Sequence, residues 1–505
     1  MFERDFDGVL LLSALVLIAA IVSARVGARV GLPSLLLFLG LGMLMGDSGP
    51  LQIPFNDADL ARDLGFGALV LILAEGGMTT RWSDIKPSAG IAASLATVGI
   101  AASVGLMTLF GTQVLGLDLW VAVLLGAVTS PTDAAAVFSV LRNVSIPHRL
   151  RGVLEGESGL NDAPTVLLVV LASTAAAEGS AEEGLGVLIA VIAAELAGGL
   201  LIGLLLGWVG AWILRRVALP STGLYPLAAL VWIVFAYAVG AAAHTSGFAA
   251  VYICALVLGN AQLPHRGATR SFVEGIGWIA QIGLFVMLGL LASPKGVTGR
   301  EVLIGLAAGF FVTFVARPVS VWVSTLWFRV SLTEQIFLSW AGLRGAIPII
   351  LATIPLSQGI PDAQLLFDVV LVFVIVFTCL QAPTLPFVAR RLGLIDDQAA
   401  HDVEVEAAPL DKISADLLQV RIPPGSRLGG IEIGELRLPQ HTVVSLVIRD
   451  AVPFSPSARD RIKVGDELLI VTPATQRLVT EERLLALGRR GRLAGWRDRG
   501  QAAGR

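Results

Sequence analysis

A cluster of polar side chains lies at the start of a long apolar run, in the segment EGESGLNDAPTVLLVVL. In a helix, Ser158 and Asp162 share one face and Glu157 and Asn161 share the neighbouring face, because side chains four residues apart lie close together. A carboxylate held away from bulk water binds either a proton or a small hard cation, and burial favours its protonated form. Asp162 therefore has the chemistry to couple two opposite fluxes at one site. Asn161 adds no charge beside it, which suggests that one cation replaces one proton without net charge movement. The alternative is that Asp162 only caps a helix near a membrane interface.

Two other apolar stretches contain breaks that cost backbone hydrogen bonds. The segments Gly126–Asp133 and Gly342–Ile349 place Pro131 and Pro348 inside apolar runs, where a proline removes a hydrogen bond and disturbs the preceding turn. Interruptions at matching places in two halves of a chain are typical of transporters with inverted repeats, since half-helix ends offer dipoles and free carbonyls to an ion. Arg344, inside the second break, is suited to neutralise such carbonyl ends. The alternative is a pair of ordinary proline kinks, which neighbouring helices tolerate.

Isolated charges inside apolar segments are expensive in a membrane and are expected to have partners. Arg317, in the middle of the run FFVTFVARPVSVW, is the best candidate partner for Glu157, although a purely structural pair would read the same way. Glu75, in LAEGGMTT, is a candidate for an ion path. Glu195, in IAAELAGG, has no role that the sequence indicates.

These residues must be positioned by membrane helices. Charged residues are 15% of the 505, where soluble domains carry about 25%, and the mean hydropathy is +0.79. About 20 apolar residues are needed to cross a hydrocarbon layer about 30 Å thick as a helix. The sequence predicts thirteen spans, at approximately Val9–Ala24, Pro33–Gly46, Leu64–Met78, Gly90–Phe110, Leu119–Leu141, Gly156–Ala175, Leu185–Leu214, Leu224–Ala243, Phe248–Gly259, Phe272–Ala292, Val302–Phe328, Gln335–Leu356 and Leu365–Val388.

The loops between these spans test their number, because cytoplasmic loops hold most of the Lys and Arg. Loops after odd-numbered spans hold Arg25, Arg29, Arg81, Lys86, Arg142, Arg149, Arg151, Arg215, Arg216, Arg266, Arg270, Arg329, Arg390 and Arg391. The others hold only Arg62, Lys295 and Arg300. This alternation predicts an N-terminus outside and a C-terminus inside. It also gives the broken fifth and twelfth spans opposite directions, as an inverted repeat requires.

The character of the chain changes after the last apolar run. Residues 1–391 are predicted to form the membrane domain, 392–413 a linker, 414–485 a small α/β cytoplasmic domain and 486–505 a disordered tail. The runs LLQVRIP, TVVSLVIRD and DELLIVTP are rich in Val, Ile and Leu and are bounded by Pro, Gly and Asp, which favours strands. The tail is rich in Arg and Gly and lacks apolar periodicity.

The segments SPTDAAAV, ESGLND and GLRGAIPIILAT together resemble the cation:proton antiporter superfamily, in the branch of bacterial NhaP-type antiporters and animal sodium/proton exchangers. The resemblance covers nearly all of the first 390 residues. It implies an all-α, NhaA-like fold of about thirteen helices with inverted repeats, a homodimer, and elevator-like movement of a core domain. It also implies that Asp162 binds the ion or proton, that Asn161 completes an Asn–Asp pair, and that Ser158 and the Thr132 backbone add oxygens.

The same resemblance implies further roles in and beside the broken helices. Glu157 would pair with Arg317, and Asp133 and Arg344 would occupy additional polar positions of the two breaks. Ala134 follows Asp133 here, where many members of the family have proline.

The C-terminal segment VRIPPGSRLGGIEIGELRLPQHTVVSLVIRD with IKVGDELLIVTP is similar to the TrkA-C (RCK C-terminal) regulatory module of potassium-uptake and potassium-channel proteins. Antiporters with this module resemble potassium/proton antiporters, so K⁺ is the favoured ion and Na⁺ the alternative. The module would dimerise and bind a small regulatory ligand. The resemblance places the protein in a bacterial-type plasma membrane, with no resident cofactor.

Other classes of function are less well supported. A ligand-gated K⁺ channel would need a TVGYG-like filter loop, which the sequence lacks. A sensor that retains the membrane fold but does not transport ions is a further alternative. The only argument against it is that the polar residues expected of a transport site are all present. An enzyme is not expected, since no Ser/His pair or His-rich cluster occurs in the apolar runs. A nucleic-acid partner is not expected either, because a net charge of -3 offers no basic field.

Overall fold

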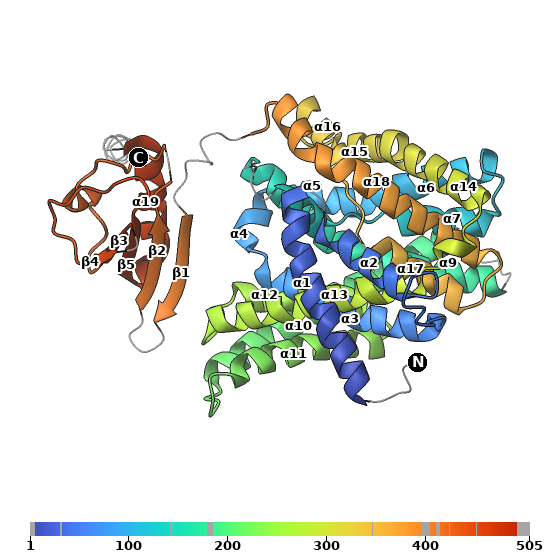
Figure 1. Ribbon diagram of the computed structural model, residues 1–505, viewed down its shortest axis with the longest axis horizontal. Coiled ribbons are helices and arrows are strands. Elements are labelled where there is room, and N and C mark those ends of the chain that lie inside the picture. Colours follow the sequence, from blue (N-terminus) through green and yellow to red (C-terminus); the bar gives the residue numbers. More distant parts are fainter. Residues whose placement is uncertain are drawn as a thin grey trace. The chain divides into compact units, whose positions relative to one another are not determined.

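The computed structural model describes residues 6–30, 33–141, 144, 146–178, 185–345, 347–395, 404–410, 415–423, 425–450 and 452–491. The chain divides after Ile395 into two compact units. Figure 1 shows a larger unit built of helices and a smaller unit built around a β-sheet.

The helices of the first unit follow one another through short connections. They are α1 (Phe6–Val30), α2 (Ser34–Met45), α3 (Ala58–Thr79), α4 (Trp82–Ile85) with η1 (Lys86–Ser88), α5 (Ala89–Ser94), η2 (Leu95–Gly99) and α6 (Ile100–Gln113), α7 (Leu119–Thr129), α8 (Ala134–Val140), α9 (His148–Glu178), α10 (Leu185–Arg216), α11 (Leu224–Ala242), α12 (Gly247–Asn260), α13 (Arg266–Leu291), η4 (Pro294–Gly296), α14 (Gly299–Phe311) with η5 (Val312–Ala316) and α15 (Arg317–Thr325), α16 (Leu332–Trp340), α17 (Ile347–Ser357) and α18 (Ala363–Arg391).

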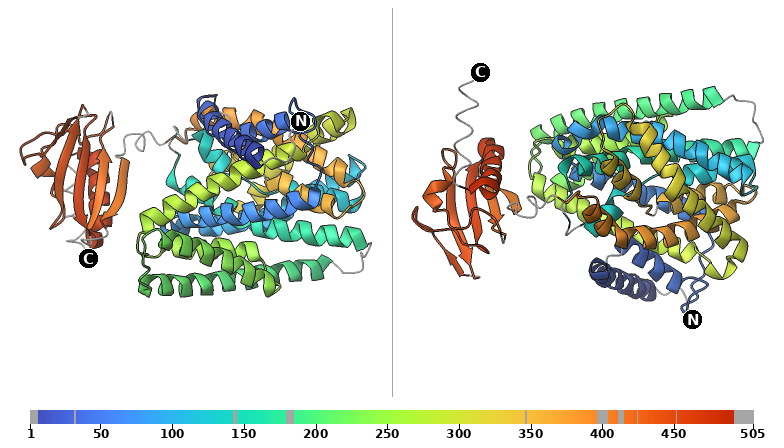
Figure 2. Two further views of the ribbon diagram at one scale, coloured as in Figure 1. Left: turned by 60° about the horizontal axis from the view of Figure 1, so that its bottom comes forward. Right: turned by 90° about the horizontal axis from the view of Figure 1, so that it is seen from above.

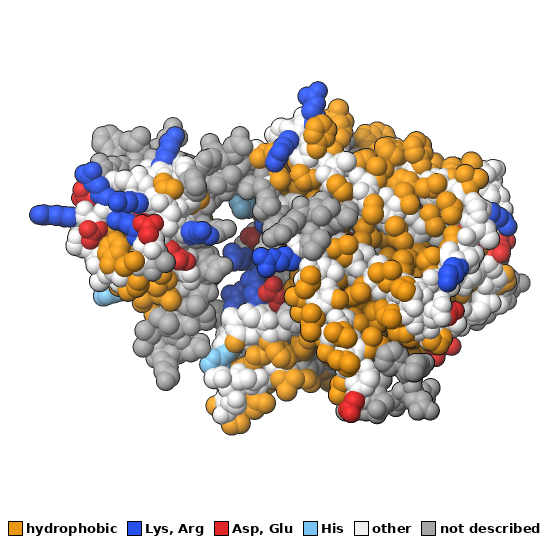
Figure 3. All heavy atoms as spheres, viewed as in Figure 1, with side chains coloured by type: hydrophobic (Ala, Val, Ile, Leu, Met, Phe, Trp, Pro, Cys, Tyr) orange, Lys and Arg blue, Asp and Glu red, His pale blue; other side chains and the backbone are white. Residues whose placement is uncertain are grey.

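Within the described residues these helices form thirteen segments when continuous stretches and the two broken pairs are each counted once, in agreement with the sequence. In the part of the chain that the structure describes, seven helical stretches are long and apolar enough to cross a membrane, and five shorter apolar helices accompany them. The face of this unit in Figure 3 is covered mainly by hydrophobic side chains. Exposed Leu201, Trp208 and Phe310 exemplify a surface suited to lipid rather than water.

Some helix ends differ from the sequence prediction. The third span begins at Ala58 rather than Leu64, because Asp57 accepts a 2.9 Å hydrogen bond from the Leu60 amide and caps a charged first turn. Arg62 bridges to Asp59 on that turn. The fourth span begins at Trp82, well before the apolar run, so hydropathy alone underestimates helices that continue into the interface.

Two membrane segments contain a π-helical turn, η2 in the fourth segment and η5 in the eleventh. These segments are seven apart in order, the same offset that relates the two broken helices, which supports an inverted repeat. The two segments also pack together, with the Ser94 hydroxyl donating a 2.8 Å hydrogen bond to the Ser324 carbonyl. Arg317 follows η5 directly, so the extra residue in that turn sets the face on which the guanidinium projects.

The helices pack closely where small residues meet. A Cβ at Gly42 of α2 would overlap the α13 backbone at Val286 and Gly289, and a Cβ at Gly289 would overlap the α2 backbone in return. Such mutual contacts allow backbones to approach in a membrane, where packing rather than hydrophobicity drives association. Figures 1 and 2 show α10, α11 and α12 side by side in another such layer.

The second unit is a five-stranded antiparallel sheet with strand order β1-β2-β5-β3-β4 and a helix, α19 (Arg477–Arg490), against it. The strands are β1 (Glu404–Leu410), β2 (Ala415–Arg421), β3 (Val443–Arg449), β4 (Val452–Phe454) and β5 (Glu467–Pro473). The three runs read as strands from the sequence correspond to β2, β3 and β5. Leu484 and Leu487 of α19 close a separate hydrophobic core with Leu468 and Ile470 of β5.

Two boundaries in this unit differ from the prediction. Residues Glu404–Leu410, expected in the linker, form the edge strand β1 paired with β2, although their Glu, Ala and Pro content gives no strand signal. Residues 486–490, expected in the disordered tail, belong to α19, since Leu487 is needed in the core. The rest of the expected tail, from residue 492, lies outside the described residues.

Candidate functional site

The C-terminal ends of two half-helices meet at one buried arginine side chain. α7 ends at Thr129 and α16 at Trp340, leaving unpaired carbonyls that carry partial negative charge. Arg344, only 3% exposed, donates from Nε to the Thr129 carbonyl at 3.1 Å and from Nη1 to the Gly342 carbonyl. The guanidinium therefore supplies donors and positive charge at both helix ends, the arrangement expected for Arg344.

The half-helices that follow the two breaks are α8 and α17. We call the place where the two broken pairs meet the crossing. Asp133 caps α8, because its Oδ1 accepts a 3.1 Å hydrogen bond from the Ala136 amide. The Asp133 amide donates at 2.8 Å to the Leu343 carbonyl, so the two breaks are joined through their backbones. Pro131 lies in the gap between α7 and α8. Pro348 lies in the first turn of α17, where a proline is tolerated, so the second break precedes it.

The polar cluster of α9 faces this crossing. The Asn161 amide donates to the Thr132 hydroxyl at 3.0 Å and more weakly to the Thr132 carbonyl at 3.4 Å. Ser158 Oγ accepts a 3.2 Å hydrogen bond from the Ala134 amide at the start of α8. Asp162 is 4% exposed, and its Oδ1 has no hydrogen-bond partner among the described residues. Asn161 Oδ1 is likewise unpartnered among them. Two buried oxygens are therefore available to a cation, and the carboxylate oxygen is also available to a proton.

A cavity of about 600 Å³ reaches this cluster. Its wall includes Asp162, Ser158 and Asp133 from the predicted site, and Glu75 from α3. Thus the structure brings the predicted ion-path acid to the same space as the predicted binding acid. Asn161 and Thr132 are not part of this wall, and the hydrogen bond between them joins α9 to the segment between α7 and α8.

The cavity wall also contains charged residues to which the sequence analysis gave no role at the site. They are Arg81, Asp84, His148, Arg151, Glu155 and Arg270. Arg151 pairs with Glu155 at 3.0 Å, and Arg270 donates to the Thr79 carbonyl. The three arginines among them belong to the arginine-rich loops after odd-numbered spans, a pattern that indicates the orientation of the chain but not a shared cavity.

Tyr252 of α12 was also missed, because a tyrosine in an apolar run carries no signal for function. Its ring occupies the space that a Cβ at Gly159 would need, one helix turn from Asp162. Tyr252 also lines the cavity. The contact between α9 and α12 beside the binding acid therefore depends on a residue without a side chain.

Glu157 is held away from the cavity in an ion pair. Arg317 donates from Nη1 to Glu157 Oε1 at 2.5 Å and from Nη2 to Oε2 at 2.9 Å, with a further 3.2 Å bond to the Leu338 carbonyl. The two side chains are 2% and 4% exposed. The pair links α9, α15 and α16, which fits the structural role predicted for it. Glu195, on α10, is outside this network; its carbonyl accepts a 3.0 Å bond from the Ser246 amide.

Comparison with known proteins agrees with this geometry. Residues 14–391 match the family "Sodium/hydrogen exchanger, transmembrane", and residues 417–484 match the TrkA-C domain. A K⁺/H⁺ antiporter NhaP2 of Shewanella baltica is 32% identical over 93% of this chain and 82% of that protein. A K⁺/H⁺ antiporter NhaP of Alkalimonas amylolytica is 38% identical over 81% and 70%, respectively.

The fold is also found in a solved structure. The sodium proton antiporter MjNhaP1 of Methanocaldococcus jannaschii superposes with a TM-score of 0.63 at 22% identity, over 75% of this chain and 100% of the other. With broken helices that cross, a buried aspartate beside them and a family match across the membrane unit, the chain belongs to the sodium/hydrogen exchanger family and ends in a TrkA-C domain.

Proposed function

We propose that this protein exchanges K⁺ for H⁺ across the membrane, with Asp162 as the group that both ions share. The observation that carries the proposal is Asp162 Oδ1, a nearly buried carboxylate oxygen without a partner in the described residues, at the wall of a cavity. A buried acid in this state either holds a proton or needs a counter-ion. Proton and cation then exclude each other, and their movements are coupled.

The surrounding groups have defined tasks in this exchange. Ser158 Oγ and the Asp133 carboxylate belong to the same cavity wall as the acid, and Asn161, the next residue along α9, carries a buried oxygen without a partner among the described residues. Oxygen is the ligand type that hard cations prefer. Thr132 fixes the Asn161 amide. Arg344 offsets the half-helix carbonyl ends, so the crossing persists whether or not a cation is bound. Alternating access then moves the crossing and the acid between the two sides.

Potassium is favoured by the names of the relatives and by the TrkA-C domain. The two curated relatives described above are K⁺/H⁺ antiporters, while the matched family is named for sodium/hydrogen exchange, so Na⁺ is the second candidate. A ligand-gated K⁺ channel is supported only by the regulatory domain and lacks a filter sequence.

We further propose one-for-one, electroneutral exchange. Glu157 is neutralised by Arg317, and Asn161 adds no charge, which leaves Asp162 as the acid that changes state. Because Asp133 and Glu75 line the same cavity, this assignment needs its own test. On solid-supported membranes, a K⁺ concentration jump should evoke no transient current in the wild type beyond that of empty liposomes. A transient current above that of empty liposomes would overturn the one-for-one ratio.

The assembly is proposed to be a homodimer in a bacterial-type plasma membrane, with the N-terminus outside and the C-terminal unit in the cytoplasm. The alternation of arginine between loops supports this orientation. The C-terminal unit is proposed to bind a small regulatory ligand.

The ion assignment is tested in proteoliposomes that contain a pH-sensitive dye. Outside pulses of K⁺, Na⁺ and Li⁺ at equal ionic strength should evoke proton efflux with K⁺ strongest, and choline should evoke none. Protein-free liposomes control for leak. A response to Na⁺ and Li⁺ without one to K⁺ would exclude the potassium assignment, and a K⁺ flux without proton movement would favour a channel.

A further inference from the structure

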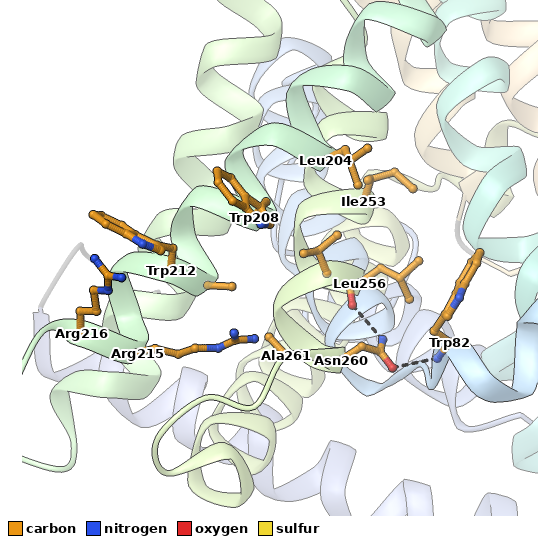
Figure 4. Close-up of a pocket in the computed structure, with 12 residues that line it drawn as sticks. Trp82, Leu204, Trp208, Trp212, Arg215, Arg216, Ile253, Leu256, Asn260 and Ala261 are labelled. Carbon is orange, nitrogen blue, oxygen red and sulfur yellow. Dashed lines mark hydrogen bonds between the residues drawn. The ribbon is translucent and has the colours of Figure 1, made fainter.

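A second cavity lies away from the ion site, at the ends of α10 and α12. It has a volume of about 680 Å³ and is lined by α10 from Leu204 to its end, by α12 from Ile253 to its end, and by Trp82 at the start of α4. Figure 4 shows Arg215 extending from α10 toward the end of α12, while Arg216 turns back beside Trp212. We call this cavity the α10 groove.

The α10 groove opens on a helix that the protein itself barely covers. Only 11% of the most apolar window of α10 is buried, the lowest share among the seven long spans of the described residues. Leu204 and Trp208, which line the groove, are 54% and 66% exposed. In a membrane this surface must be covered by lipid chains or by another apolar surface.

The charge at the end of the groove is positive and unmatched. Arg215 and Arg216 form the last turn of α10, and no ion pair joins either of them to an acid among the described residues. The described groove lining includes no Asp or Glu. The guanidinium of Arg216 lies 4.4 Å from the centre of the Trp212 ring, which holds it at the edge of the groove. Tryptophan and arginine together mark the depth of lipid headgroups.

We propose that the α10 groove binds an anionic phospholipid, with its phosphate at Arg215 and Arg216 and an acyl chain along Leu204 and Trp208. Two arginines without acidic partners complement a phosphodiester, whereas a second copy of the same surface would bring like charges together. Basic pockets between membrane helices on the cytoplasmic side are suited to such headgroups. The positive loops place this end of α10 on that side.

The bound lipid would touch helices that belong to different parts of the transport unit. Asn260 of α12 accepts a 2.8 Å bond from the Trp82 amide and donates to the Thr80 carbonyl at 3.0 Å. α4, which starts at Trp82, packs against α9, the helix of Asp162. A lipid in the groove therefore contacts both the α10–α12 layer and the helix beside the ion-binding helix. This placement leads us to expect that anionic lipid alters the exchange rate.

Binding is tested on the full chain, delipidated in detergent, by native mass spectrometry with added phosphatidylglycerol or phosphatidylcholine. The wild type should retain phosphatidylglycerol, and R215A/R216A should weaken its apparent affinity by roughly tenfold or more. R390A/R391A is the matched control, since these exposed arginines end α18 in the same way but line no described cavity. R215K/R216K keeps the charge and should keep most of the binding.

Location is tested by fluorescence quenching in liposomes with brominated phosphatidylglycerol. Quenching should exceed that by brominated phosphatidylcholine, and Trp208→Phe should remove part of the excess. Equal loss of lipid in both arginine pairs, or no loss in either, would overturn the site. A change in oligomeric state of R215A/R216A without a change in lipid retention would assign the groove to a second copy instead. Lipid retention and fluorescence quenching do not depend on transport, so a failure of the lipid site can be distinguished from a failure of the proposed exchange.

Discussion

Two acids on α9 have opposite surroundings and therefore different chemistry. Glu157 is fixed by the two terminal nitrogens of a buried guanidinium, whereas Asp162 keeps an oxygen without a partner among the described residues. The sequence indicated both acids and the partner Arg317, because charges in apolar runs are rare enough to stand out. It could not show that Asn161 is held by the Thr132 hydroxyl, since that bond depends on how the broken helix bends.

The Glu157–Arg317 pair predicts a specific pattern of stability. Removing one partner leaves an unpaired buried charge, which typically costs about 3–5 kcal/mol, while removing both avoids that penalty. Glu157→Gln and Arg317→Met should each lower the melting temperature in detergent more than the double variant does. Additive losses in this double-mutant cycle would show that the two side chains do not act as a pair.

A second ion pair, between the partly exposed Arg449 and the buried Asp466 of the C-terminal unit, predicts a dependence of stability on pH. Burial alone would raise the pKa of Asp466, but hydrogen bonds from Arg449 at 2.8 and 2.7 Å and from the Lys463 amide at 2.7 Å hold that pKa below its usual range. The folded state thus gains stability above the unfolded pKa of about 3.9 and loses it as pH falls through the lower folded value.

Asp466→Asn should therefore weaken the C-terminal unit at pH 7, by about 1–3 kcal/mol, and make little difference below the folded pKa. Hydrogen exchange of β5 in the full chain, corrected for intrinsic rates at each pH, measures this directly. Asp460→Asn is the comparison, since Asp460 accepts a hydrogen bond from the Ser457 amide in a turn outside the sheet, and its loss should change the protection of β5 less than Asp466→Asn does. A loss of protection in Asp466→Asn that stays constant across the acid range would contradict the linkage.

At the scale of elements, the ion site depends on interruptions rather than on regular helices. The broken pairs α7–α8 and α16–α17 were recognisable because Gly and Pro interrupt apolar runs, and the loops imply that the two pairs run in opposite directions. The crossing of the two pairs was implied only by the family resemblance. The π turns η2 and η5 were not recognisable, because their residues are ordinary for a membrane helix. The packing of α9 on α12 was also not recognisable from the sequence, since it depends on the absence of a side chain at Gly159.

Gly159→Ala is predicted to impair exchange while leaving the protein folded. The added Cβ would overlap the Tyr252 ring and disturb the contact between α9 and α12 beside Asp162. Initial K⁺-evoked proton efflux should fall at least severalfold, and Tyr252→Ala in the same chain should restore part of it. Gly67→Ala on α3 is the matched control, since a Cβ there meets nothing within 4 Å. Equal rates in Gly159→Ala and Gly67→Ala would refute the proposed contact.

At the scale of the whole molecule, the chain joins a membrane unit to a separate sheet domain with its own core. Hydropathy and loop charges were sufficient to identify the first unit, and runs rich in Val, Ile and Leu between Pro, Gly and Asp identified three strands of the second. The edge strand β1 was not predicted, because its pairing with β2, rather than its composition, makes it a strand. The charged wall of the cavity beside Asp162 was not predicted, because its residues come from helix ends far apart in sequence.

This division predicts that exchange survives loss of the second unit. A chain ending at Asp397 keeps every residue assigned to the ion site and should retain measurable K⁺/H⁺ exchange in proteoliposomes, with altered dependence on cytoplasmic-side pH or ligand. Size-exclusion chromatography identifies well-folded truncated protein. A complete loss of exchange in such protein would mean that the C-terminal unit is required for transport itself.

The shared use of Asp162 by two ions is tested most directly by measuring half-saturating K⁺ concentration against pH in proteoliposomes. Because protons compete for the same carboxylate, that concentration should fall as pH rises. Asp162→Asn should abolish K⁺-evoked proton movement at every pH, whereas Asp368→Asn, an equally buried acid of α18 outside the described cavities, should retain it. Persistent proton-coupled K⁺ movement in Asp162→Asn, or a half-saturating concentration independent of pH in the wild type, would contradict the account.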